Sequence, residues 1–82
     1  MSELTGLTAV VTGAGSGIGL ATARNFAADG ARVFGFDLSA GDMDGVAEWI
    51  RCDVGSTESV ESAFARLREQ VSVLDILAGP QG

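Results

Sequence analysis

The sequence contains no histidine, no lysine and no tyrosine, and its single cysteine is Cys52. A lone cysteine cannot form a disulfide within the chain, and without histidine the commonest nitrogen ligand of metal sites is missing. Cys52 lies in an apolar run, so we interpret it as a small residue of the core. The sequence therefore predicts neither an internal disulfide nor a metal site.

Positive charge is also scarce, since eleven acidic residues outnumber five arginines and leave a net charge of -6. Nucleic-acid binding depends on clustered cations, so this balance disfavours it. No apolar run approaches the roughly 20 residues that cross a bilayer, and the opening "MSELTGLT" lacks the basic start and apolar body of a signal peptide. We expect a cytoplasmic protein that binds neither nucleic acid nor membranes.

The chain nevertheless has the composition of a folded domain, because 46% of its residues are hydrophobic and only one is proline. Its length of 82 residues indicates one small domain or a piece of a larger one. A chain of this size buries only roughly 60 to 65% of its extended-chain surface on folding. We treat residues 1–82 as a single domain.

Apolar strands and amphipathic helices alternate along the chain. We expect strands over 7–12, 31–36, 48–52 and 72–77, and helices over 18–29 and from 56 or 57 onward. Such alternation implies a parallel sheet with right-handed crossovers, here in the order 3-2-1-4. The fold class is therefore α/β, with three layers.

Each expected helix has an apolar stripe that predicts its buried face. In the first helix, Ile18, Thr22 and Phe26 recur at four-residue spacing, and in the second the corresponding residues are Val60, Phe64, Leu67 and Val71. The segment between the second and third strands contains glycines and aspartates and lacks periodicity. We expect a loop there that leaves one side of the sheet thinly covered.

The stretch "VVTGAGSGIGLA" leads from the first strand into the first helix. Glycine allows close approach, and the free N–H groups of a helix start attract phosphate. The spacing is T-G-x-x-x-G-x-G, at Thr12, Gly13, Gly17 and Gly19. This pattern predicts a pyrophosphate site; the alternative is a tight turn whose glycines serve packing only.

Two acidic residues end the second and third strands. Asp37 stands where a carboxylate can accept hydrogen bonds from both hydroxyls of an adenosine ribose, and Asp53 would lie at the same edge of the sheet. The alternative for each is a turn or cap residue. Because Asp42 and Asp44 lie close to Asp37 in the sequence and no arginine or lysine lies between Leu38 and Arg51, the carboxylates would repel a ribose 2'-phosphate. NAD is preferred over NADP.

Taken together, these features resemble the short-chain dehydrogenase/reductase family, with its Rossmann-like fold, from about Leu7 to Leu77. The resemblance rests on "TGAGSGIG", on Asp37, on "CDV" at 52–54 and on "LDIL" at 74–77. It implies that Ser16 and Ile18 lie along the pyrophosphate and that Asp53 and Val54 lie beside the adenine. NAD(H) is the expected cofactor and partner.

The resemblance stops after "LDIL", where the family usually continues V-N-N-A-G and this chain reads "AGPQG". The family's catalytic serine, tyrosine and lysine, the last two as Y-x-x-x-K, have no counterpart because the chain has no tyrosine and no lysine. The resemblance thus implies a truncated, N-terminal NAD-binding half of an enzyme for alcohols or ketones, including hydroxysteroids. We assign no catalytic residue and expect no activity from this half alone.

Two other functions stay open. The chain could be a structural module that associates with itself and leaves its nucleotide cleft unused. In either case we expect a homo-oligomer through the free edge of the fourth strand or the exposed helix faces. A methyltransferase fragment is a further alternative, because Gly13, Gly15 and Gly17 also fit a G-x-G-x-G loop.

Overall fold

A computed structural model describes residues 3–79, which contain four strands and two helices, with a loop instead of a helix between the second and third strands. This order confirms the α/β class. The elements are β1 (Thr8–Thr12), α1 (Gly17–Ala28), β2 (Arg32–Asp37), β3 (Glu48–Arg51), α2 (Thr57–Gln70) and β4 (Ile76–Ala78).

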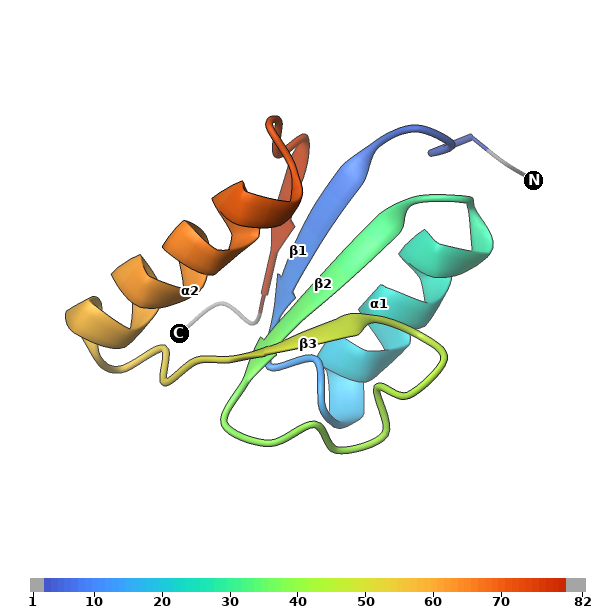
Figure 1. Ribbon diagram of the computed structural model, residues 1–82. Coiled ribbons are helices and arrows are strands. Elements are labelled where there is room, and N and C mark those ends of the chain that lie inside the picture. The colour runs from blue at the N-terminus through green and yellow to red at the C-terminus, as the bar shows by residue number, and fades with distance from the viewer. Residues whose placement is uncertain (1–2, 80–82) are drawn as a thin grey trace.

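The strands form one parallel sheet in the order β3-β2-β1-β4, as the sequence predicts. Helix α1 covers one face of the sheet and α2 covers the other, which gives three layers (Figure 1). Because all four strands run the same way, their carboxyl ends share one edge. The glycine loop and the residues that follow β2 and β3 all leave the sheet at that edge.

The face under α2 holds the larger aromatic residues. Phe34 and Phe36 alternate with Gly35 along β2, so both rings point to this face, where they pack with Val10 and Leu67. The ring of Phe36 meets that of Phe64 edge to face, with centroids 5.1 Å apart. Cys52 is buried in the same cluster, which confirms its predicted place in the core.

The opposite face is covered by α1 and by the loop 38–47. This loop contains no helix, but its Met43 is fully buried and packs with Val11, Val33 and Ala23. Met43 occupies the space above Gly35, where any Cβ would overlap its sulfur atom. The face that we expected to be thinly covered is therefore closed by a buried loop side chain.

The predicted apolar stripe of α1 is right at Phe26, which packs against the core, and wrong at its first two residues. Ile18 is 82% exposed and Thr22 is only partly buried, whereas the buried residues of α1 are Gly19, Leu20 and Ala23. The reason lies at the helix start, where Gly19 packs so closely on Gly13 that a Cβ would overlap the Gly13 carbonyl oxygen. That approach turns the Gly19 side of α1 toward the sheet and Ile18 toward solvent.

The fourth strand is shorter than predicted, because pairing covers only Ile76–Ala78. Ile76 pairs with Ala9, and β1 starts at Thr8, so residues 72–74 have no strand beside them. Asp75 instead joins this segment to the start of β1 by hydrogen bonds. Its N–H donates to the Thr8 carbonyl, and its carboxylate accepts from the Thr8 N–H at 2.8 Å. The other strands begin and end within about one residue of expectation, and α2 begins at one of the two predicted residues, Thr57.

Candidate functional site

The glycine loop connects β1 to α1 through two residues with left-handed backbone angles. Gly13 has φ of 67° and Gly17 has φ of 61°, which residues with a Cβ rarely adopt. The N–H of Gly13 donates to the carbonyl of Phe36 at 2.7 Å, which ties the start of the loop to β2. Gly19 then packs on Gly13 as described above. The loop is a tight turn held against β2 and the start of α1.

The start of α1 differs from the start of α2 in how its N–H groups are satisfied. At α2, the Ser56 side chain accepts from the Ser59 N–H and Glu58 lies in the first turn. Within the described residues, α1 has neither a side-chain cap from Ser16 nor an acid in its first turn. Its free N–H groups and its positive dipole end can therefore receive an anion from outside the chain.

The carboxylate of Asp37 lies against the glycine loop. Its Oδ2 accepts from the N–H of Gly15 at 2.9 Å, and its Oδ1 accepts from the N–H of Leu38 at 2.7 Å. A Cβ on Gly15 would be 2.9 Å from that same Oδ2, so a side chain at this position would displace the carboxylate or the loop. Each carboxylate oxygen retains a further acceptor position. Asp37 is half-buried and can still accept hydrogen bonds from a ribose diol.

The backbone of Asp37 is fixed as well. Its carbonyl oxygen accepts from the N–H of Cys52 and from the indole N–H of Trp49, each at 3.0 Å. Sequence reasoning did not find either the Gly15 or the Trp49 contact. Gly15 lies outside the T-G-x-x-x-G-x-G spacing, and nothing in the sequence indicates which way Trp49 points.

Asp53 adopts the turn geometry that we considered as the alternative. Its Oδ1 accepts from the N–H of Gly55 at 2.9 Å, and its own N–H donates to the Ser59 hydroxyl at 2.8 Å. The residue is exposed, as is the neighbouring Val54. The turn orders Asp53 at the carboxyl end of β3 and leaves its side chain accessible.

The remaining predicted residues surround the turn. Ser16 and Ile18 are exposed at the start of α1. The Thr12 hydroxyl donates to the carbonyl of Ala78 at 3.5 Å, which links the ends of β1 and β4. Thr12 thus contacts the neighbouring strand, while the start of α1 presents its backbone to solvent.

The loop after β2 also contacts the glycine loop, which sequence reasoning missed. The N–H of Asp42 donates to the Gly15 carbonyl at 3.0 Å, and a Cβ on Gly41 would overlap the same oxygen. In Figure 1 this loop passes beneath the start of α1. It forms one wall of the region around Asp37.

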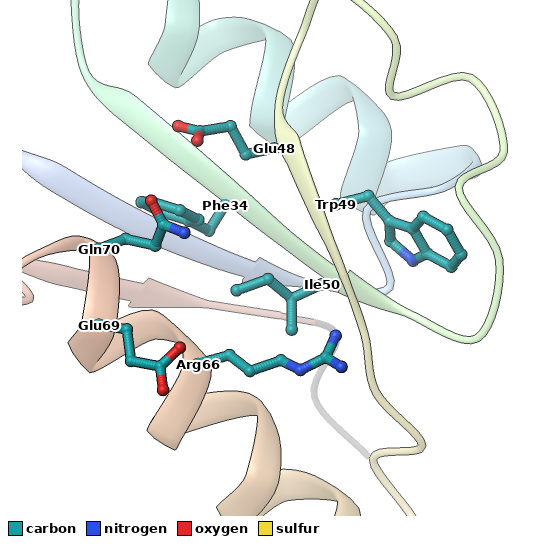
Figure 2. A pocket seen from close by; sticks show the side chains of 7 residues that line it. All are labelled: Phe34, Glu48, Trp49, Ile50, Arg66, Glu69 and Gln70. Atoms are coloured by element: carbon teal, nitrogen blue, oxygen red, sulfur yellow. The ribbon is translucent and has the colours of Figure 1, made fainter.

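A separate cavity of about 400 Å³ lies between β3 and the C-terminal half of α2. Figure 2 shows Arg66 and Glu69 extending from α2, while the Trp49 ring points away from them. The lining contains none of the predicted cofactor-binding residues; it consists of Phe34, Glu48, Trp49, Ile50, Arg66, Glu69 and Gln70.

Near this cavity, Arg32 forms a 2.7 Å ion pair with Glu48, and the hydrogen bond to that carboxylate raises the pKa of the Arg32 guanidinium. Arg32 and Glu48 are therefore paired with each other at this end of the sheet.

Neither a candidate metal site nor a candidate membrane-spanning helix is found among residues 3–79. Over that range, His, Cys, Asp and Glu side chains form no group of three or more that could hold a metal ion. None of the helices over the same range is long and apolar enough to cross a membrane.

Comparison with known proteins identifies relatives along most of the chain. A family model described as short chain dehydrogenase matches residues 7–80. The 2-(R)-hydroxypropyl-CoM dehydrogenase of Xanthobacter autotrophicus is 39% identical over 90% of this chain and 34% of its own length. The galactitol 2-dehydrogenase of Cereibacter sphaeroides is 41% identical over 98% of this chain and 34% of its own length.

Two solved structures have the same fold. The ligand-free aldohexose dehydrogenase of Thermoplasma acidophilum superposes with a TM-score of 0.86 at 27% identity, over 99% of this chain and 31% of that one. A structure described as a ribose-5-phosphate isomerase from Brucella melitensis gives 0.90 at 36% identity, over 99% of this chain and 34% of that one. Because these two descriptions name different reactions, likeness of fold does not by itself assign a reaction.

The chain spans about a third of the length of the curated relatives that it matches. The family match, the sheet order and the glycine loop agree with one another, and they leave no support for a methyltransferase. The family uses nicotinamide cofactors, and the start of α1 with Asp37 beside it suits a dinucleotide. This chain belongs to the short-chain dehydrogenase family.

Proposed function

We propose that the chain is the dinucleotide-binding half of a short-chain dehydrogenase and that it binds NAD(H) where the strands end. The observation that carries the proposal is the pairing of the uncapped start of α1 with the Asp37 carboxylate, which is hydrogen-bonded to Gly15 at 2.9 Å. The start of α1 suits a pyrophosphate and the Asp37 carboxylate suits a ribose. The glycine loop holds these two groups side by side. Residues 1–82 are treated as one such domain.

The predicted residues then have distinct roles. Backbone N–H groups of Ser16, Gly17, Ile18 and Gly19 face the pyrophosphate, and Thr12 and Gly13 support the turn that presents them. Asp37 accepts hydrogen bonds from the adenosine ribose. Asp53 and Val54, which are exposed at the end of β3, lie beside the adenine. When bound, the nicotinamide supplies hydride transfer.

Local charge favours NAD over NADP. A ribose 2'-phosphate would approach the Asp37 carboxylate, and two further acids, Asp42 and Asp44, lie in the loop that follows. In the same loop, residues 38–47, no basic side chain is present to compensate. Like charges at short range disfavour binding, so we propose NAD as the cofactor.

The proposed reaction of the whole enzyme is the interconversion of an alcohol and a ketone. The support is that relatives are named as a 2-(R)-hydroxypropyl-CoM dehydrogenase, a 2,5-dichloro-2,5-cyclohexadiene-1,4-diol dehydrogenase and a galactitol 2-dehydrogenase. A hydroxysteroid substrate stays a prediction from the sequence resemblance. Because the 82 residues contain no tyrosine and no lysine, we propose that they do not catalyse the reaction by themselves. We also propose a cytoplasmic location, and the support for it is the amino-acid composition alone.

NAD is expected to stabilise the folded chain. A ligand at ten times its dissociation constant adds about 1.4 kcal/mol to the free energy of unfolding. For a domain of this size the melting temperature then rises by about 5 to 10 °C. The measurement is a melting curve at millimolar NAD, with fluorescence of Trp49 recorded in parallel. An unchanged melting temperature and unchanged fluorescence up to 10 mM NAD would contradict the proposed function.

Self-association is the second candidate function, and the edge of the sheet favours it. Strand β4 pairs with β1 on one side, and its Leu77 is 60% exposed. An apolar strand edge of this kind invites pairing with a second copy. We propose a homo-oligomer through this edge or through the exposed helix faces, independent of NAD.

The oligomer is tested by sedimentation velocity at about 100 μM, a concentration at which a micromolar dimer is nearly complete. We expect a dimer for the wild type and a shift toward monomer for Leu77→Ser, which removes apolar area from the edge. Val54→Ser is the matched control, because Val54 is similarly exposed but lies away from β4. A monomeric wild type, or equal effects of the two substitutions, would count against the edge.

A further inference from the structure

Trp49 lies on the edge strand β3, yet its polar atom is directed at the end of β2. In the sheet register Trp49 is the partner of Gly35, and its indole N–H reaches two residues further along β2 to the carbonyl of Asp37, at 3.0 Å. Figure 2 shows the ring turned away from Arg66 and Glu69, toward the loop that joins β2 to β3. The indole therefore extends along the strand toward the candidate site.

The hydrogen bond from the Trp49 indole restrains the backbone of Asp37, whose carboxylate is already held by other hydrogen bonds. Cys52 holds the same carbonyl through its backbone N–H. On the other side, Gly15 and Leu38 donate to the Asp37 carboxylate. Asp37 is thus held at both ends, and the Trp49 contact is the one at its carbonyl that a substitution can remove.

The geometry points to Trp49 as a positioning residue for the adenosine ribose, which it affects through Asp37 without touching the ligand. This inference rests on the proposed NAD site. Without the indole N–H, the Asp37 carbonyl keeps only the bond from Cys52, so the end of β2 is less restrained and the carboxylate spends less time beside Gly15. Holding an acceptor in place before binding reduces the entropy lost on binding.

The experiment is a titration of the ¹⁵N-labelled full chain with NAD, followed by NMR. Trp49→Phe keeps an aromatic ring and removes the N–H. The loss of one hydrogen bond predicts that the dissociation constant for NAD rises about 3- to 10-fold. Ile50→Val is the matched control, since it weakens packing in the same strand under α2 and should leave the affinity within twofold of the wild type.

A double-substitution cycle separates positioning from general destabilisation. If Trp49 acts through the Asp37 carboxylate, Trp49→Phe should change the affinity less than twofold in the Asp37→Ala background, where that acceptor is absent. Equal losses in both backgrounds, or wild-type affinity in Trp49→Phe, would overturn the inference.

A measurement without NAD distinguishes this failure from failure of the proposed function. Amide exchange of Gly15 and Leu38 should be faster in Trp49→Phe than in the wild type, because both N–H groups donate to Asp37. If the wild type shows no NAD-induced shifts, the proposed function is wrong, whereas unchanged exchange rates would show that Trp49 does not hold Asp37.

Discussion

Replacing Asp37 with alanine is expected to lower NAD affinity by about 2 to 4 kcal/mol, roughly 30- to 1,000-fold. The substitution removes a charged acceptor for the ribose hydroxyls and also the acceptor for the Gly15 and Leu38 N–H groups. Because the glycine loop loses a restraint, the pyrophosphate site is weakened with the ribose site. The measurement is the NMR titration with NAD described above.

The same variant should narrow the preference for NAD over NADP, since it removes a negative charge near a 2'-phosphate. For the loss of NAD affinity, the matched control is Asp42→Ala, which makes the same change of charge in the adjoining loop. The contact of Asp42 with Gly15 is made by its backbone N–H and is retained. If Asp37→Ala and Asp42→Ala weaken NAD binding equally, Asp37 is not a specific ribose ligand.

Gly19→Ala is expected to destabilise the fold by about 2 to 3 kcal/mol, although alanine is the better helix former. In a free helix the change would stabilise by roughly 0.5 to 1 kcal/mol. Here the added methyl group overlaps the Gly13 carbonyl oxygen. That backbone cannot withdraw easily, because the Gly13 N–H is bonded to Phe36 at 2.7 Å. The steric term therefore exceeds the helix propensity.

Thermal melting tests this directly, and a fall of about 10 to 20 °C is expected. The loss is large for a domain of this size, whose total stability is on the order of 4 to 12 kcal/mol. Gly55→Ala makes the same chemical change where the new Cβ meets only Asp53 Oδ1, at 3.3 Å, and should shift the melting temperature by no more than a few degrees. A Gly19→Ala variant as stable as the wild type would show that α1 can move away from Gly13.

Strand order and element order could be predicted because they follow from local patterns and a general rule of handedness. Short apolar runs such as "LTAVVT" and the four-residue spacing of Val60 and Phe64 need no tertiary information. The parallel order β3-β2-β1-β4 then follows from alternation and right-handed crossovers. The position of Asp37 at the end of β2 follows in the same way.

Helix orientation and side-chain direction could not be predicted in this way. The spacing of Ile18, Thr22 and Phe26 indicates a buried stripe, but close packing of Gly19 on Gly13 rotates α1 and exposes Ile18. The length of β4 depended on where β1 begins, since pairing requires a neighbour. Both outcomes are set by contacts between segments distant in the sequence.

By itself, the sequence determined the α/β class, the family resemblance and the acidic residue that ends β2, because each depends on residue types at fixed spacing. Only the tertiary structure decided that Gly15 and Trp49 hold Asp37 from two sides, that the loop 38–47 forms a wall beside it, and that Met43 closes the sheet above Gly35. The physical reason is that a hydrogen bond between residues far apart in the chain depends on the positions of both partners after packing. Spacing along the chain specifies neither position.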